Sequence, residues 1–283
     1  MRALLRADAS VTLGSGHIMR CLTLASAMQQ HGVTCEFICR QSDGNLITWL
    51  RDQNINVMTI PQTINSEEED AQFCLSVITG HYQLLVVDHY QLSAPFCQIL
   101  RPYCTHIMVI DDLANRQHDC DLLLDQNLFP DSTLRYRHLV PPSCTQLLGP
   151  RYALLRDEFY QVHNPRQTQH ILVGFGGSDE QNLTKLAVQA IDKLKPMQIT
   201  ADIVIGANNP WRAMLEQQIA CLPNVQLHVQ CKNMATLMRR ARLMLGAGGA
   251  THWERCICGL PGLIVTVAEN QQATTAYLDH LGA

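Results

Sequence analysis

A series of short, continuous apolar runs that alternate with segments of helical periodicity most constrains the fold of this chain. The clearest runs are residues 84–87 and 106–110, and polar residues follow each of them at once. Such runs are typical of strands buried on both faces, as in a parallel sheet covered by helices. Because the carboxyl ends of parallel strands lie at one edge, the polar residues after them are expected to share a crevice.

The first forty residues predict a strand, a glycine turn and a helix. The apolar residues 3–5 lead to Gly14 and Gly16, which let the backbone approach a ligand closely. His17 then lies in the first helical turn, where the helix dipole disfavours imidazolium and leaves a neutral ring able to accept a proton. The alternative is that His17 is merely a polar residue at the start of a surface helix.

Composition limits the class of protein. A chain of 283 residues with 47% hydrophobic and 16% charged residues has enough apolar material for two domains. Its formal charge of −4 argues against broad binding to nucleic acid or to anionic membranes. No apolar stretch approaches the ~20 residues that span a bilayer, and Arg6 and Asp8 interrupt the apolar start before it resembles a signal core. We expect a soluble, cytoplasmic protein; its oligomeric state is not indicated.

The cysteines do not indicate a metal site or a disulfide framework. All twelve are scattered along the chain without a CxxC pair, so we expect reduced thiols. Cys35 and Cys39, like Cys256 and Cys258, lack zinc-site spacing and lie in apolar surroundings. The Asp-x-Asp pattern at 119–121 precedes an apolar strand and is interpreted as its cap. We predict no metal and no cofactor.

A proline-rich stretch suggests a domain junction. Residues 130–165 contain five of the twelve prolines, so regular structure is hard to sustain there. The predicted fold class is α/β, with Rossmann-like domains at 1–145 and 146–283. The second begins with a strand that enters a glycine turn at 170–179. A helix is then expected at 180–193, and strands at 202–205, 225–229, 243–246 and 263–267.

The glycine turn of the second domain is a candidate phosphate site. Gly176, Gly177 and Ser178 could offer backbone N–H groups and a hydroxyl to a diphosphate, with Asn182 one turn further along. The loop is not GxGxxG and has no P-loop lysine, so a nicotinamide cofactor or ATP hydrolysis gains little support. The alternative is a glycine turn required only for packing.

A second glycine turn follows the apolar residues 243–245. It contains Gly248 and Gly249 and leads through Thr251 to Glu254. If a helix opens there, Glu254 lies in its first turn, where a carboxylate can accept two hydrogen bonds from a ribose diol. The alternative is that Glu254 only interacts favourably with the helix dipole.

Taken in order, these motifs resemble the UDP-2,4-diacetamido-2,4,6-trideoxy-β-L-altropyranose hydrolases of pseudaminic acid biosynthesis. The resemblance covers essentially the whole chain. It rests on six segments, which occur in this order: 6–8, 14–20, 87–90, 152–159, 176–179 and 251–254.

The resemblance implies a GT-B architecture, as in inverting glycosyltransferases, with the sugar held by the N-terminal domain and UDP by the C-terminal one. It also implies that water replaces the sugar acceptor and that the glycosidic C–O bond breaks with inversion. His17 matches the family's proposed general base. Asn182 and Glu254 match positions associated there with UDP.

Four polar residues at predicted strand ends of the first domain are candidate sugar contacts or partners of His17. They are Asp8, Asp88, His89 and Tyr90. The alternative is that these side chains satisfy loop amides. Tyr152, Arg156 and Glu158, after the junction, either line a cleft between the domains or pack between them.

The sequence is also compatible with other functions. An inverting glycosyltransferase could use the same base on a sugar hydroxyl, and a nucleotide-sugar binding module would bind without turnover. A Rossmann oxidoreductase gains little support because no NAD-type loop is present. In each of the first two cases the partner is a UDP-sugar, and the sequence does not choose among related amino sugars.

Overall fold

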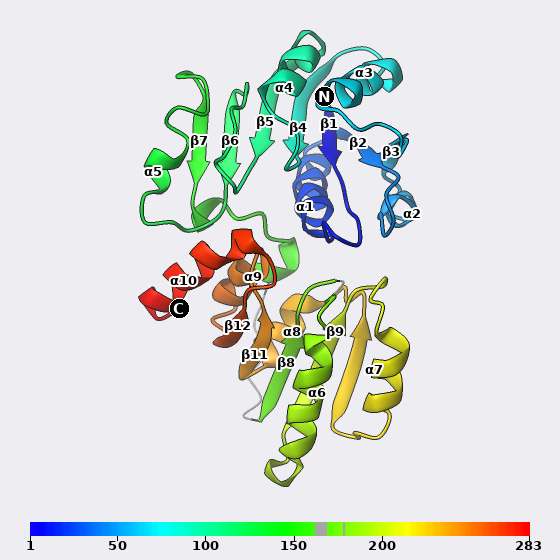
Figure 1. The fold of residues 1–283 in the computed structure, drawn as a ribbon, viewed down its shortest axis with the longest axis vertical. Coiled ribbons are helices and arrows are strands. Elements are labelled where there is room, and N and C mark those ends of the chain that lie inside the picture. Colours follow the sequence, from blue (N-terminus) through cyan, green and yellow to red (C-terminus); the bar gives the residue numbers. More distant parts are fainter. Residues whose placement is uncertain (162–168, 178) are drawn as a thin grey trace. The chain divides into compact units, whose positions relative to one another are not determined.

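The computed structural model describes residues 1–161, 169–177 and 179–283. The chain forms two compact units, Met1–Leu154 and Leu155–Ala283. Each unit contains one parallel sheet with helices packed against it (Figure 1). The expectation of an α/β fold with two Rossmann-like units is confirmed.

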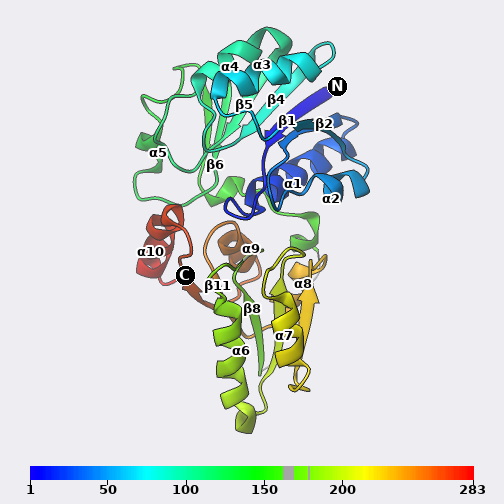
Figure 2. The same cartoon turned by 45° about the vertical axis from the view of Figure 1, so that its right-hand side comes forward.

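The first unit is built on a seven-stranded sheet. Figure 2 shows α3 (Glu67–Val77) and α4 (Ala94–Leu100) side by side on one face, with α1 (Gly16–Gln30) and α2 (Ile47–Asp52) on the other. A short helix, α5 (Ser132–Arg135), precedes the last strand. In sheet order the strands are β3 (Asn56–Ile60), β2 (Thr34–Arg40), β1 (Arg2–Ala7), β4 (Tyr82–Asp88), β5 (Cys104–Ile110), β6 (Leu122–Asp125) and β7 (Thr145–Leu148).

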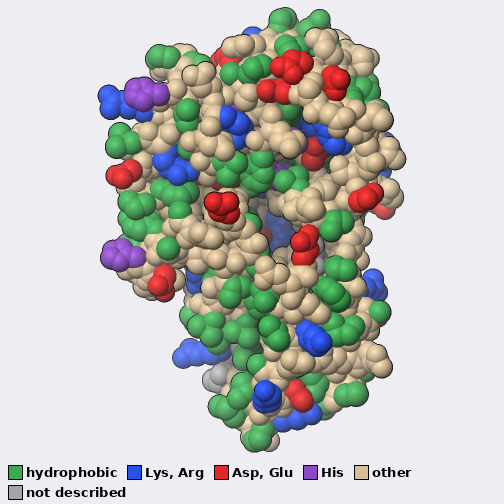
Figure 3. Space-filling model, viewed as in Figure 1, with side chains coloured by type: hydrophobic (Ala, Val, Ile, Leu, Met, Phe, Trp, Pro, Cys, Tyr) green, Lys and Arg blue, Asp and Glu red, His purple; other side chains and the backbone are tan. Residues whose placement is uncertain are grey.

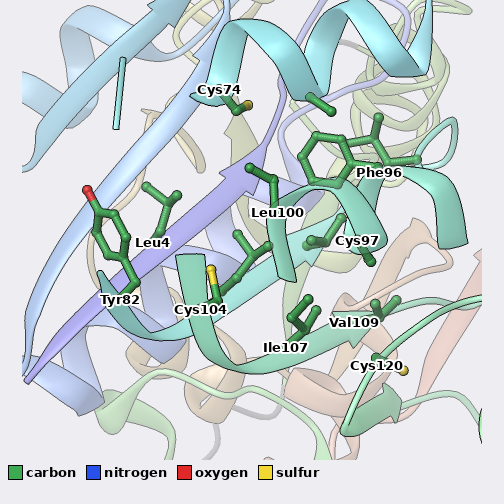
Figure 4. Packing of buried hydrophobic residues seen from close by; sticks show 14 of the residues in the cluster. Leu4, Cys74, Tyr82, Phe96, Cys97, Leu100, Cys104, Ile107, Val109 and Cys120 are labelled. Carbon is green, nitrogen blue, oxygen red and sulfur yellow. The ribbon is translucent and has the colours of Figure 1, made fainter. Parts of the chain in front are cut away.

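Burial on both faces explains the continuous apolar runs. In β1, Leu4 points into the core beneath α3 and α4, whereas its neighbour Leu5 points into the core beneath α1 and α2. Figure 4 shows the first of these cores, where Phe96 and Leu100 of α4 pack over the sheet. Successive strand residues face opposite sides, so most positions of a doubly covered strand are apolar.

The acidic run after residue 65 forms the start of α3. The Ser66 hydroxyl accepts a hydrogen bond from the Glu69 backbone N–H, and the Glu69 carboxylate accepts one from the Ser66 backbone N–H. This reciprocal cap satisfies two N–H groups that the helix itself leaves unpaired. The remaining acidic residues of the first turn favour the positive end of the helix dipole.

The proline-rich stretch is more ordered than expected. Residues 145–148 form β7, which pairs in parallel with β6, so the prediction that regular structure is not sustained there is wrong for this segment. Pro141 and Pro142 precede the strand, and Pro150 opens the 3-10 helix η2 (Pro150–Tyr152) after it. The strand itself lacks proline and keeps its ladder hydrogen bonds. The first unit therefore extends to Leu154 instead of ending at the expected boundary of 145/146.

The second unit contains a five-stranded sheet. Two helices cover one face, α6 (Leu183–Lys193) and α7 (Arg212–Ile219), and α8 (Met234–Arg240) covers the other. The helices α9 (Thr251–Ile257) and α10 (Gln272–Leu281) follow the last two strands. In sheet order the strands are β10 (Val225–Val229), β9 (Thr200–Ile205), β8 (His170–Gly174), β11 (Leu243–Ala247) and β12 (Gly262–Val265).

Charged side chains of both signs are interspersed on the face of the molecule in Figure 3. That face has no broad basic patch of the kind with which proteins bind nucleic-acid phosphates. Among the helices of the described residues, none combines the length and apolar character required to cross a membrane.

The carboxylate of Asp125, the last residue of β6, is almost fully buried. It accepts hydrogen bonds from the Asn127 backbone N–H at 3.0 Å, from the Tyr136 hydroxyl at 3.1 Å and from Arg135 Nε at 3.3 Å. Burial nevertheless raises the pKa of Asp125 to about 6. A raised pKa in the folded state means that this group stabilises the fold below its unfolded pKa of about 3.9. That stabilisation is lost as the pH rises through about 6.

Asp125→Asn changes the free energy of unfolding. We predict that this change is about 1 kcal/mol more stabilising at pH 8 than at pH 5. The amide cannot ionise, so the variant escapes the cost that wild type acquires as the pH rises. Urea unfolding at both pH values measures the difference. The exposed Asp52→Asn on α2 is the control and should differ by less than about 0.5 kcal/mol. Equal effects of Asp125→Asn at both pH values would contradict the prediction.

Candidate functional site

His17 is the second residue of α1 and is 4% exposed. Its Nδ1 lies 2.5 Å from Oδ1 of Asp88, the last residue of β4. An ionised carboxylate can only accept hydrogen bonds, so Nδ1 carries the ring hydrogen. The lone pair is then on Nε2, which forms no hydrogen bond to any described residue. The pair therefore presents an imidazole in the tautomer required of a proton acceptor.

Arg20, one turn further along α1, secures the same carboxylate. Its Nε and Nη2 donate to the two oxygens of Asp88, the latter at 2.6 Å. Burial would by itself raise the pKa of Asp88, but the charges and hydrogen bonds of Arg20 and His17 hold it well below its ordinary value. The sequence argument about His17 considered only the helix dipole. The structure adds the Asp88 carboxylate, which contacts the imidazole directly.

Tyr90 and Asp112 complete the surroundings of His17. The ring of Tyr90 meets that of His17 edge-on, with 4.4 Å between centroids. The Tyr90 hydroxyl lies 3.5 Å from Oδ2 of Asp112, and Nη1 of Arg20 lies 3.4 Å from the same oxygen. Burial raises the pKa of Tyr90, so its hydroxyl stays protonated and able to donate.

Sequence reasoning did not select Arg20 or Asp112 as site residues. Arg20 is three residues after His17 and so shares its helix face, which is a usable signal. Asp112 follows β5, the neighbour of β4 in the sheet, but the order of the strands was required to place it beside Asp88.

Asp8 and His89 belong to an internal network. Both oxygens of Asp8 accept from Arg6, at 2.6 and 2.9 Å, and His89 Nε2 lies 3.1 Å from Oδ2. Burial would raise the pKa of Asp8, but Arg6 and His89 lower it well below its ordinary value. Arg6 also pairs with the buried Asp70. This supports the structural alternative for Asp8 and His89, and their contact with a sugar stays a prediction.

Gly14 and Gly16 border open space. A Cβ added at either glycine would meet no other atom within 4 Å. Packing therefore does not require a glycine at 16, whereas Gly14 has a φ of +74°, which side chains rarely adopt. Tyr152, in η2 at the end of the first unit, is 37% exposed.

In the second unit, Glu254 lies in the first turn of α9 and is held by an arginine. Nη2 of Arg156 lies 3.2 Å from its Oε1, and Nη1 of Arg156 contacts Glu158 at 2.8 Å. Burial raises the pKa of Glu254, an effect that Arg156 partly offsets. No described residue donates to Oε2, so one oxygen of Glu254 is available to a ligand.

The two glycine turns differ in their packing. A Cβ on Gly176, which has a φ of +89°, would meet no other atom within 4 Å. A Cβ on Gly248 would lie 3.0–3.1 Å from Thr275 Oγ1, Gln271 Oε1 and His252 Nε2, so packing alone favours glycine at that position.

The other predicted UDP contacts lie close to these turns. Gly249 has a φ of +95°, and Thr251 begins α9 directly after this turn. Asn182 is the N-cap of α6, where its side chain accepts from the Lys185 backbone N–H. Ser178 lies outside the described residues, and Gly177 is the last described residue before it. Whether these residues bind a nucleotide stays a prediction.

Gln271 is a neighbour of the second turn that sequence reasoning did not select. Its Oε1 accepts from the Val267 backbone N–H at 3.0 Å. No pattern in the sequence marks this glutamine, because only the folded chain brings it to the turn. Within the part of the chain that the structure describes, no group of three His, Cys, Asp or Glu side chains is arranged to hold a metal ion.

Comparison with known proteins shows which proteins the chain resembles. It is 26% identical, over 100% of its own length and 97% of the relative's, to the UDP-2,4-diacetamido-2,4,6-trideoxy-beta-L-altropyranose hydrolase of Campylobacter jejuni. It is 25% identical to the uncharacterized protein MJ1062 of Methanocaldococcus jannaschii. That alignment covers 99% of the chain but only 58% of the relative. No protein-family model matches the chain.

Among solved structures, MurG of Acinetobacter baumannii aligns with 100% of this chain and 84% of its own, with a TM-score of 0.60 and 17% identity. At this identity the likeness concerns the fold, which is GT-B. The full-length alignment with the Campylobacter protein confirms the resemblance that the ordered motifs indicated. Along its full length the chain therefore resembles the UDP-2,4-diacetamido-2,4,6-trideoxy-β-L-altropyranose hydrolases.

Proposed function

We propose that this protein hydrolyses a UDP-linked 2,4-diacetamido-2,4,6-trideoxyhexose to UDP and the free sugar, as a step of pseudaminic acid biosynthesis. The observation that carries the proposal is the pairing of His17 Nδ1 with Asp88 at 2.5 Å, which leaves Nε2 as a proton acceptor. The relationship to a hydrolase along the whole chain supports the choice of reaction.

The proposed base acts on water. His17 Nε2 takes one proton from a water molecule while the water oxygen forms a bond to the anomeric carbon. The Asp88 carboxylate holds the ring in the required tautomer and stabilises the imidazolium as it forms. Arg20 holds the carboxylate through two hydrogen bonds, which favours one orientation of the ring.

The second bond change is cleavage of the bond between the anomeric carbon and the diphosphate oxygen. UDP departs with the bonding electron pair, and attack from the opposite face inverts the anomeric centre. UDP is already a competent leaving group, so the main task is to hold it and to stabilise the charge that grows on the diphosphate. We assign this task to the two glycine turns and to the first turn of α9.

Glu254 is assigned to the ribose. Its free Oε2 can accept hydrogen bonds from the ribose hydroxyls, while Arg156 holds Oε1. In the first unit, the open space at Gly14 and Gly16 and the hydroxyl of Tyr90 are assigned to the sugar.

His17→Ala should lower kcat for UDP release at least about 100-fold, because the general base is lost. The affinity for UDP, measured by calorimetry, should stay within about threefold, since the proposed UDP contacts are in the other unit. His31→Ala, at the exposed C-cap of the same helix, is the matched control and should keep wild-type rates. An unchanged rate in His17→Ala would refute the assignment.

Measurements with the nucleotide sugar as substrate distinguish a hydrolase from a transferase and from a binding module. UDP and free sugar should appear in equal amounts from the nucleotide sugar without any acceptor, and NMR of fresh product should show the inverted anomer. UDP release that requires an added sugar acceptor would identify a glycosyltransferase. Calorimetric binding of the nucleotide sugar without turnover would identify a binding module.

Glu254→Gln should weaken UDP binding about 10- to 100-fold, because hydrogen bonds from ribose to a charged acceptor become bonds to a neutral one. The loss should appear in Kd and KM more than in kcat. Glu216→Gln, on the exposed surface of α7, is the control and should bind UDP as wild type does. Equal affinity in Glu254→Gln and wild type would remove Glu254 from the site.

A further inference from the structure

A cavity of about 460 Å³ lies within the second unit, between α9, β12 and α10. Its volume is in the range of pockets that bind small molecules. Polar residues from both helices line it, among them Arg255 and His252 of α9 and Thr275 and Asp279 of α10. None of these residues is among those assigned to UDP or to the sugar.

Among the residues that line this cavity, Arg255 is unusual because it is a buried cation. It is 4% exposed, and its Nη1 donates to the Leu260 carbonyl at 3.0 Å. Its Nε has no acceptor, and no carboxylate of the described residues lies within ion-pair distance of the guanidinium. The buried Arg6 and Arg20, in contrast, are each paired with aspartates. A buried cation without a counter-charge is costly in free energy.

The side chains beside Arg255 in the cavity wall do not supply that charge. Burial and the charge of Arg255 lower the pKa of His252 to about 4, so its ring is neutral at pH 7. His252 Nε2 pairs with Thr275 Oγ1 at 3.0 Å, whereas its Nδ1 has no partner among the described residues. The Asp279 carboxylate is on the wall, but it is exposed to solvent and forms no ion pair with Arg255.

We propose that this cavity binds a small oxyanion, the carboxylate or phosphate group of a metabolite, with Arg255 as its counter-ion. The guanidinium offers its Nη2, which Leu260 leaves free, as the donor to the anion. Planar N–H donors of arginine match carboxylate and phosphate oxygens in geometry.

Ala276 offers a test that leaves Arg255 in place. It is an exposed residue of α10 that lines the cavity. Ala276→Glu places a carboxylate on the wall, whereas Ala276→Gln is nearly the same size and has a similar helix propensity. The pair therefore separates an effect of charge from an effect of bulk.

The probes are inorganic phosphate and citrate, titrated calorimetrically into the full chain at constant ionic strength balanced with chloride. Wild type and Ala276→Gln should bind at least one probe saturably, and Ala276→Glu should bind it about tenfold or more weakly. The same probe should raise Tm in the first two proteins and not in the third.

The probe that binds tells whether the site prefers phosphate or carboxylate. Equal isotherms in Ala276→Glu and Ala276→Gln, or no binding of either probe to wild type, would overturn the proposal. UDP affinity, measured in parallel, should be alike in all three proteins. Absence of UDP binding would count against the proposed function and not against this cavity.

Discussion

The candidate site depends on one buried carboxylate, that of Asp88. It stands at the end of β4, directly beside Ala7, the last residue of β1, and the chain leaves β1 to enter α1. A single aspartate at this place can therefore bind His17 and Arg20 from the same helix face. The arrangement fixes the ring tautomer and keeps the negative charge neutralised in the interior, which is the condition for burying it.

The same principle organises the neighbouring strand ends. Parallel strands place their carboxyl ends at one edge, and in this unit the edge is occupied by aspartates that pair with arginines. Arg6 joins Asp8 to Asp70, and Arg20 joins Asp88 to Asp112. Each pairing offsets the cost of burial and removes freedom from the side chains involved. Rigid surroundings of this kind suit a base that has to hold one orientation.

The second unit uses charge differently. Arg156 contacts Glu158 and Glu254 together and leaves one oxygen of Glu254 free, as a binding residue requires. Arg255, the residue after Glu254, lines the cavity and lacks a carboxylate partner among the described residues. Adjacent residues of α9 thus differ in their pairing: Glu254 contacts Arg156, whereas Arg255 lines the cavity.

The sequence by itself determined the fold class and the start of the first helix. Doubly buried strands need apolar residues on both faces, and a glycine turn before α1 is a local feature, so both can be recognised without tertiary information. Tertiary structure decided the roles of the polar residues. Whether Asp8 or Asp88 meets His17 depends on which strand lies beside β1, and strand order is a property of distant segments. The position of β7, the pairing of Arg156 with Glu254 and the isolation of Arg255 also arise from contacts between segments that no local pattern encodes.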